Sequence, residues 1–404
     1  MTQPEFTIRT CTPDEWESTA RVFTGAMLFD FVGSELNRRR FEPDRALVAE
    51  ADGRVIGSAK AVTRDMSLPG AVAPVAHVTG VGVGQDFRRR GVLSALMRRQ
   101  LREVPEALAA LWASDTGIYG RYGYAAAAYA MPVAAELPRL GVLPGTEPGT
   151  VREIDAATAA PLLTPILQRY QRIRPGVSGR LPMHWDSELE DPAAQRHGAS
   201  ALRVFVHADP DGALDGYAIW RTRMGFDDVG ANGEVEVIEM VAPEPAANRA
   251  LWRLLLSMDP CRKLSYRHAT VDDPLLQLVS NTRALSTRRV DTVWLRVTDV
   301  PRALELRRYA APVDLVLDVR DDLIDANNGR FRLTGGPDKA RCEPTTAPAD
   351  VTVPVAELAA IYLGARSAGE FVPTGKVIEH TTGAVMAAGA AFGWPVAPGA
   401  IEIF

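Results

Sequence analysis

Residues 78–93 read VTGVGVGQDFRRRGVL, and this stretch decides the fold that we predict for the first part of the chain. Its first half is a β-strand interrupted by Gly80 and Gly82, and glycine inside a strand marks a bulge or a close approach of the backbone. Its second half is a turn that opens a helix over residues 91–104. Further strands on both sides, including a hairpin across Asp52-Gly53, indicate a mixed sheet domain.

Three arginines stand where that helix begins. A helix N-terminus already carries about half a positive charge, so cations there are unfavourable by several tenths of a kcal/mol each unless an anion offsets them. A pyrophosphate held by backbone N–H groups of the turn would be such an anion, and a splayed strand leaves backbone groups free for the amides of pantetheine. We therefore predict a coenzyme A site, formed by Val81, Gly82, Val83, Arg88, Arg89, Arg90, Gly91 and Val92.

Two other interpretations of this stretch stay open. The arginines could be a solvated surface run and the glycines only turn residues. A dinucleotide-binding loop is disfavoured, because Gln85 stands where the last glycine of that motif should be.

The same order of elements recurs in the middle of the chain. A strand over residues 234–241 is followed by a turn, Ala242-Pro243-Glu244-Pro245, that lacks glycine and arginine and carries an acid. This pattern indicates a duplicated domain whose second copy lost its anion site, although two similar units could also arise by chance. After Pro301 the pattern changes to a smaller α+β domain. We expect a mixed α+β fold with domains at residues 1–140, 141–297 and 298–404.

Composition narrows the range of functions. The 404 residues carry a formal net charge of −5, which argues against non-specific nucleic-acid binding because that needs a broad basic face. Cys11, Cys261 and Cys342 are odd in number and widely spaced, which favours a reducing, cytoplasmic location. We expect no metal site, because the histidines show no ligand spacing, and no membrane span, because no apolar run is long enough.

Several motifs together resemble those of a known family. They are Arg88-Arg89-Arg90-Gly91-Val92-Leu93, Gly117-Ile118-Tyr119-Gly120-Arg121-Tyr122-Gly123-Tyr124, Val293-Trp294-Leu295-Arg296 and Ala340-Arg341-Cys342, with an apolar C-terminus. The combination resembles the Eis (enhanced intracellular survival) family of actinobacterial acetyltransferases, within the GNAT superfamily; Leu93 departs from the small residue usual in that superfamily. The resemblance implies two tandem GNAT domains, a C-terminal domain similar to sterol carrier protein, and acetyl-CoA as co-substrate. It also implies a hexamer that acetylates aminoglycosides and other amines, and hence antibiotic resistance.

The resemblance also assigns roles to individual residues. Tyr119 would be the general acid, because a phenol with a pKa of about 10 suits protonation of a thiolate whose pKa is about 8.5. The terminal carboxylate of Phe404 would be the base, and Asp30 and Glu402 would bind the amine. The family pattern expects an acid next to the terminal residue, but Ile403 occupies that place. Each role has a structural alternative: Tyr119 and Phe404 could simply pack, and Asp30 could cap a turn.

The function predicted from these observations is acetyl-CoA-dependent N-acetyl transfer to a small-molecule amine. Two other functions remain open. One is a scaffold that binds coenzyme A without catalysis. The other is a lipid carrier that works through the C-terminal domain.

Overall fold

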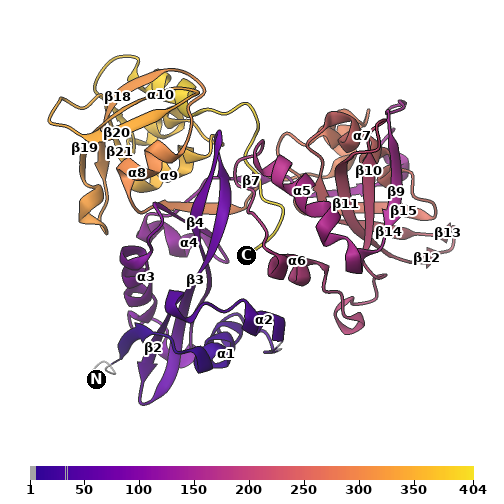
Figure 1. Ribbon diagram of the computed structural model, residues 1–404, viewed down its shortest axis with the longest axis horizontal. Helices are drawn as coiled ribbons and strands as arrows, with labels where there is room; N and C mark the ends of the chain where they lie inside the picture. The colour runs from indigo at the N-terminus through magenta and orange to yellow at the C-terminus, as the bar shows by residue number, and fades with distance from the viewer. Residues whose placement is uncertain (1–5, 32, 34) are drawn as a thin grey trace. The chain divides into compact units, whose positions relative to one another are not determined.

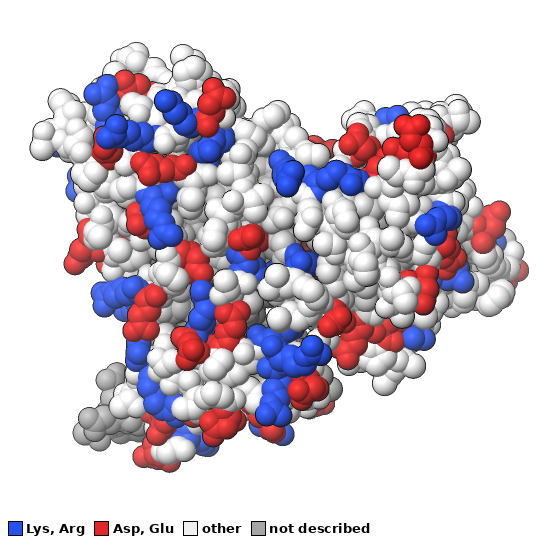
Figure 2. Space-filling model, viewed as in Figure 1, with Lys and Arg blue, Asp and Glu red and all other residues white. Residues whose placement is uncertain are grey.

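The computed structural model describes residues 6–31, 33 and 35–404, which form two compact units (Figure 1). Unit 1 comprises Met1–Ala127, Val293–Trp394 and Phe404, and unit 2 comprises Ala128–Thr292 and Pro395–Ile403. Charges of both signs are interspersed over the face shown in Figure 2.

Unit 1 contains a seven-stranded sheet that carries the predicted strand–turn–helix. Its strands, in sheet order, are β1 (Thr7–Thr10), β2 (Ala46–Ala51), β3 (Arg54–Leu68), β4 (Ala71–Val83), β5 (Leu108–Trp112), β17 (Val293–Val297) and β6 (Ala125–Ala126). Helices α1 (Trp16–Ala26) and α3 (Val92–Glu103) pack against β3 and β4. The hairpin predicted across Asp52-Gly53 joins β2 to β3, and both turn residues have the positive φ that a tight hairpin turn requires.

Strand β4 has both features predicted from its glycines. The register between β3 and β4 shifts at Gly80, whose φ is +59° and whose carbonyl accepts a hydrogen bond from Ser58 Oγ at 2.8 Å. A Cβ on Gly80 would lie 2.2 Å from Lys60 Cε, and any side chain would be strained at this positive φ, so the bulge favours glycine. A Cβ on Gly82 would lie 3.0 Å from Phe23 Cα, so the close approach at that position is made by helix α1.

The two central parallel strands of unit 1 soon separate. Strand β4 pairs with β5 only at Ala76↔Ala109 and His77↔Ala110, and β4 then continues to Val83 without that neighbour. The backbone of the last residues of β4 is therefore free, on the β5 side, to pair with another extended group.

Unit 2 repeats this topology in a six-stranded sheet. Its strands, in sheet order, are β8 (Val133–Glu136), β15 (Cys261–Tyr266), β14 (Gly233–Val241), β11 (Leu214–Arg223), β10 (Arg203–Ala208) and β9 (Thr150–Ile154). Helix α5 (Ala160–Gln171) buries Leu163 and Ile166 in one apolar cluster of unit 2, and α7 (Pro245–Leu256) buries Leu251 and Trp252 in another. The repeat predicted from sequence is thus present in the strand order of both sheets.

Two strands belong to the sheet of the other unit than the one that the predicted domain boundaries assign them to. Strand β8 lies within residues 1–140 but pairs with β15 in unit 2, and β17 lies within residues 141–297 but pairs with β5 in unit 1. The chain leaves unit 1 after Ala127 and returns at Val293, so the boundary predicted at residues 140 and 141 lies inside unit 2. Both strands are short and largely apolar, so their sequences do not say which sheet each one completes.

The C-terminal part of unit 1 is a five-stranded sheet with three helices. Its elements are α8 (Val300–Leu306), β18 (Val313–Arg320), β19 (Gly329–Gly335), β20 (Ala340–Pro344), β21 (Val351–Pro354), α9 (Val355–Tyr362), β22 (Ile378–Glu379) and α10 (Ala384–Phe392). Its interior holds the fully buried Arg307, whose guanidinium carbon lies 4.8, 5.6 and 4.7 Å from the ring centroids of Tyr309, Tyr362 and Phe392. The guanidinium donates to the carbonyls that end α9 and α10, those of Tyr362 and Phe392.

Candidate active site

A cavity of about 570 Å³ opens in unit 1 beside the free end of β4. Its walls come from the end of α1, the last residues of β4, the turn into α3, and the short helix α4 (Thr116–Tyr119). All of the residues predicted to bind coenzyme A except Arg90 line this cavity, namely Val81, Gly82, Val83, Arg88, Arg89, Gly91 and Val92.

The turn into α3 is shaped for a group that approaches its backbone. Gly91 is the N-cap of α3 with φ +83°, and no side chain caps the helix there, so the first N–H groups of α3 have no side-chain acceptor among the described residues. A Cβ on Gly91 would meet no atom within 4 Å. Arg89 also adopts a positive φ, of +60°, which is uncommon for a residue other than glycine. Unpaired N–H groups at a helix N-terminus beside Arg88 and Arg89 suit a phosphate.

Replacing Gly91 by Ala should weaken coenzyme A binding. A Cβ at this positive φ is strained by about 1 kcal/mol, which corresponds to roughly a fivefold higher Kd if the turn shifts to relieve it. Titration calorimetry with coenzyme A measures this change. Gly198→Ala is the matched control, because Gly198 has φ +85°, equally open surroundings and a place in unit 2. An equal loss of affinity in both variants would contradict the assignment.

Arg90 has a different environment from the other two arginines. Its guanidinium lies over the Phe87 ring at 5.2 Å, and Arg54 lies near the same ring at 5.4 Å. Arg90 therefore packs beside the turn and does not line the cavity.

Tyr119 ends α4 and is almost fully buried at the cavity wall. Asp115 caps α4 by accepting a hydrogen bond from the Gly117 N–H at 2.8 Å. Burial raises the pKa of the Tyr119 phenol, and a hydrogen bond with Ser114 opposes that shift. The phenol is therefore protonated at neutral pH and can donate a proton. Ser114 also lines the cavity, and no sequence motif indicated it.

Phe404 belongs to unit 1, where its ring contacts His77. The two ring centroids are 4.3 Å apart and the rings are inclined by 59°. His77 is fully buried at the last β4–β5 pair, and its Nδ1 lies 2.8 Å from the Val75 carbonyl oxygen. Because a carbonyl only accepts, Nδ1 carries the proton. His77 was missed in the sequence, although a histidine within an apolar strand is a signal that could have drawn attention to it.

The two acids predicted to bind the amine lie in different environments. Asp30 is exposed, and no residue in the described ranges forms an ion pair or hydrogen bond with it. Glu402 is buried in unit 2 and forms an ion pair with Arg180 at 2.7 Å. Arg180 also forms an ion pair with Glu239 at 2.6 Å, so one guanidinium is shared between two buried carboxylates.

The second copy of the strand–turn–helix, in unit 2, differs from the first in the turn that precedes its helix. Glu244 is the N-cap of α7, with Pro245 directly after it and Pro243 before it. An anionic side chain and two residues without N–H groups at a helix N-terminus disfavour a phosphate. Unit 2 thus lacks the chemistry of the anion site in unit 1.

The cavity of unit 1 fits acetyl-CoA by three independent features. These are the free backbone at the end of β4, the glycine-capped N-terminus of α3, and the two arginines of the turn. Within the described part of the chain, no group of three or more His, Cys, Asp or Glu residues is placed to hold a metal ion. In the same residues, no helix is both long enough and apolar enough to cross a bilayer.

Comparison with known proteins also indicates an acetyltransferase. Residues 7–127 and 176–297 each match the model of an acetyltransferase (GNAT) domain, and residues 300–399 match that of a sterol carrier protein domain. An uncharacterised N-acetyltransferase of Streptomyces avermitilis is 35% identical over 97% of this chain and 98% of its own. N-acetyltransferase Eis of Mycobacterium tuberculosis is 32% identical over 92% and 93%, respectively. The crystal structure of Eis1 from Mycobacterium abscessus, also 32% identical, matches with a TM-score of 0.85 over 99% of this chain and 100% of its own.

Proposed function

Because the chain belongs to the Eis-like family of GNAT N-acetyltransferases, we propose that it acetylates amines of aminoglycosides, related polyamines or lysine side chains. The observation that supports this proposal is that Arg88, Arg89 and Tyr119 line the same cavity. An anion site alone would serve a scaffold, but a buried phenol at the same wall supplies a proton donor as well.

The residues of the chain have separate tasks in this reaction. Arg88, Arg89 and the N–H groups of α3 hold the phosphates, and the free edge of β4 aligns the pantetheine arm. The acceptor nitrogen attacks the thioester carbonyl of acetyl-CoA, so that an N–C bond forms, the C–S bond breaks and coenzyme A leaves as a thiolate. Tyr119 donates a proton to that sulfur. The carboxylate of Phe404 attracts the ammonium of the acceptor and relays its proton to water, because a carboxylate with a pKa of about 3.5 is a weak base by itself.

The lipid-carrier alternative is disfavoured by the interior of the C-terminal domain. The buried Arg307 and its three aromatic neighbours lie together in this interior, where the guanidinium binds the carbonyls that end α9 and α10. A guanidinium without a carboxylate partner in the described residues makes this interior a poor solvent for an acyl chain or a sterol. We also propose a cytoplasmic homo-hexamer, which light scattering coupled to gel filtration would test.

The decisive assay is thiol release from acetyl-CoA in the presence of different amines. We expect turnover with aminoglycosides or polyamines, and mass spectrometry should show an added acetyl group on the acceptor. Coenzyme A binding without turnover on any amine, including lysine peptides, would instead support the scaffold function.

A further inference from the structure

Unit 2 keeps the open strand end that borders the cavity of unit 1. Strand β14 pairs with β15 only as far as Val237↔Tyr266 and then continues to Val241 without that neighbour. The register between β11 and β14 also shifts beside Ile238, as the register between β3 and β4 shifts at Gly80. The end of β14 therefore has a free backbone edge on the β15 side, although the turn that follows it disfavours a phosphate.

Another cavity, of about 200 Å³, opens beside this strand end and lies entirely in unit 2. Its walls come from the elements that correspond to those of the unit 1 cavity: the end of α5, the end of β14 and the turn into α7. Val396 and Ile401, from the part of the chain after residue 395 that belongs to unit 2, complete the lining. Pockets for drug-sized ligands measure about 300–1,000 Å³, so this cavity suits a smaller molecule than coenzyme A.

Polar atoms that accept hydrogen bonds line this cavity. Asn248, near the start of α7, has a buried Oδ1 with no hydrogen-bond partner among the residues that the structure describes. Asp273 is only 8% exposed, and its Oδ1 accepts from the Leu275 N–H at 2.9 Å. No cation in the described part of the chain forms an ion pair with Asp273. A buried carboxylate without a cation and a buried amide oxygen without a donor are both unfavourable, so these two groups suit a ligand that supplies N–H groups.

The other ionisable groups of the cavity are either paired or neutral. Arg174 and Asp272 form an ion pair at 2.7 Å, and although burial opposes it, the guanidinium holds the pKa of Asp272 below its usual value. Burial lowers the pKa of His268 to about 4, so its ring is neutral at pH 7. Burial also raises the pKa of the Tyr170 and Tyr266 phenols, which are neutral as well.

Asp273 therefore gives the cavity one excess negative charge. Burial raises the pKa of this carboxyl group to about 6, so it is mostly ionised above that pH. We propose that the cavity is a binding site for a small primary ammonium ion, which donates hydrogen bonds to the Asp273 carboxylate and to Asn248 Oδ1. An ammonium group has three N–H donors, so one ion can serve both acceptors. This site is distinct from the cavity of unit 1 and needs no acetyl-CoA.

The test is calorimetric titration of the intact chain with propylammonium at pH 8, for the wild type and for Asp273→Asn. This change removes the charge, but it keeps a side-chain oxygen that can cap the turn at Leu275, because Asn is as good an N-cap as Asp. The variant should therefore fold with an unchanged Tm. We expect its Kd for propylammonium to rise at least tenfold, since hydrogen bonds to ionised groups are roughly twice as strong as those between neutral groups.

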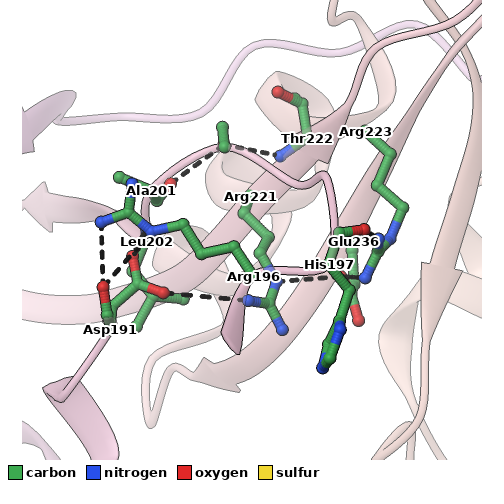
Figure 3. Close-up of polar contacts among 10 residues, drawn as sticks. Asp191, Arg196, His197, Ala201, Leu202, Arg221, Thr222, Arg223 and Glu236 are labelled. Carbon is green, nitrogen blue, oxygen red and sulfur yellow. Dashed lines mark hydrogen bonds and ion pairs between the residues drawn. The ribbon is translucent and has the colours of Figure 1, made fainter. Parts of the chain in front are cut away.

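Asp191→Asn is the matched control, in the same unit. Asp191 likewise accepts from a backbone N–H, that of Leu202 at 2.9 Å, but it forms an ion pair with Arg196 at 2.9 Å and does not line the cavity (Figure 3). Its Kd for propylammonium should equal that of the wild type.

Two further titrations of the wild type test the charge of the ligand. Propan-1-ol has the same size as propylammonium but no charge, and it should not bind. Lowering the pH from 8 to 5 should weaken propylammonium binding about tenfold, because about nine-tenths of a carboxyl group with a pKa of about 6 is protonated at pH 5. This pH dependence should disappear in Asp273→Asn.

Asn248→Leu is a second variant that does not depend on Asp273→Asn being folded. It removes the unpaired oxygen, places an apolar group in the cavity, and should also lose propylammonium binding. Wild-type affinity in either variant would overturn the inference, because an amine bound elsewhere, including at the acceptor site of the proposed function, is unaffected by these changes. Equal binding of propan-1-ol would overturn it too. Binding as predicted without turnover in the thiol-release assay would count against the proposed function alone.

Discussion

Replacing Tyr119 by Phe is expected to lower kcat about 100-fold and to leave the KM for acetyl-CoA unchanged, because general acids contribute roughly that factor. Tyr119 lies at the cavity wall, and only its hydroxyl is removed by this change. The ring and its edge contact with the Tyr124 ring, at a centroid distance of 6.1 Å, remain in place. Steady-state kinetics of thiol release with a fixed acceptor measures both constants.

The pH dependence of the same reaction gives a second readout. Burial raises the pKa of Tyr119, and the proton-donating form is the one present below that pKa. Deprotonation of Tyr119 should therefore reduce kcat only at alkaline pH, above the usual phenol pKa of about 10. In Tyr119→Phe this alkaline fall in kcat should disappear together with most of the rate.

Tyr124→Phe is the matched control for Tyr119→Phe. The Tyr124 hydroxyl is buried and has no hydrogen-bond partner within the described residues. Removing an unsatisfied buried hydroxyl costs nothing and can stabilise the protein slightly. This variant should keep its activity and its Tm. Normal turnover in Tyr119→Phe would show that another group protonates the thiolate.

Features that depend on neighbouring residues could be predicted from the sequence. The bulge at Gly80, the hairpin across Asp52-Gly53 and the helix that begins after Gly91 follow from backbone preferences of a few residues, and the structure has all three. The mixed α+β fold, the two GNAT domains, the C-terminal sterol carrier protein domain and the family are confirmed by the comparisons.

Features that depend on distant partners could not be predicted. Strands β8 and β17 are exchanged between the two sheets, because an apolar strand fits either sheet equally well and only tertiary packing decides. The ion pair between Glu402 and Arg180, which are 222 residues apart in sequence, has no local signal either. His77 belongs to no motif, and its contact with Phe404 joins residues that lie far apart in the sequence.

Removing Phe404 is expected to lower kcat about 100-fold, similar to the loss of a general base. The deletion moves the terminal carboxylate back by one residue, which is about 3.5 Å, and also removes the ring that contacts His77. Two further variants separate these effects. A chain extended by one glycine keeps the Phe404 ring but moves the carboxylate forward, whereas Phe404→Ala keeps a carboxylate at position 404 without the ring.

Comparison of kcat among the deleted chain, the extended chain and Phe404→Ala separates the contribution of the carboxylate from that of the ring. If the carboxylate acts on the acceptor, deletion and extension should both lose about 100-fold, while Phe404→Ala should lose only what the contact with His77 adds. If the ring alone matters, the extended chain should keep its activity and Phe404→Ala should be as poor as the deletion. Full activity of both the deletion and the extension would mean that the proton leaves the amine through a different group. An intermediate loss in Phe404→Ala would show that His77 orients the carboxylate through the Phe404 ring, since the ring carries no charge and cannot itself take up a proton.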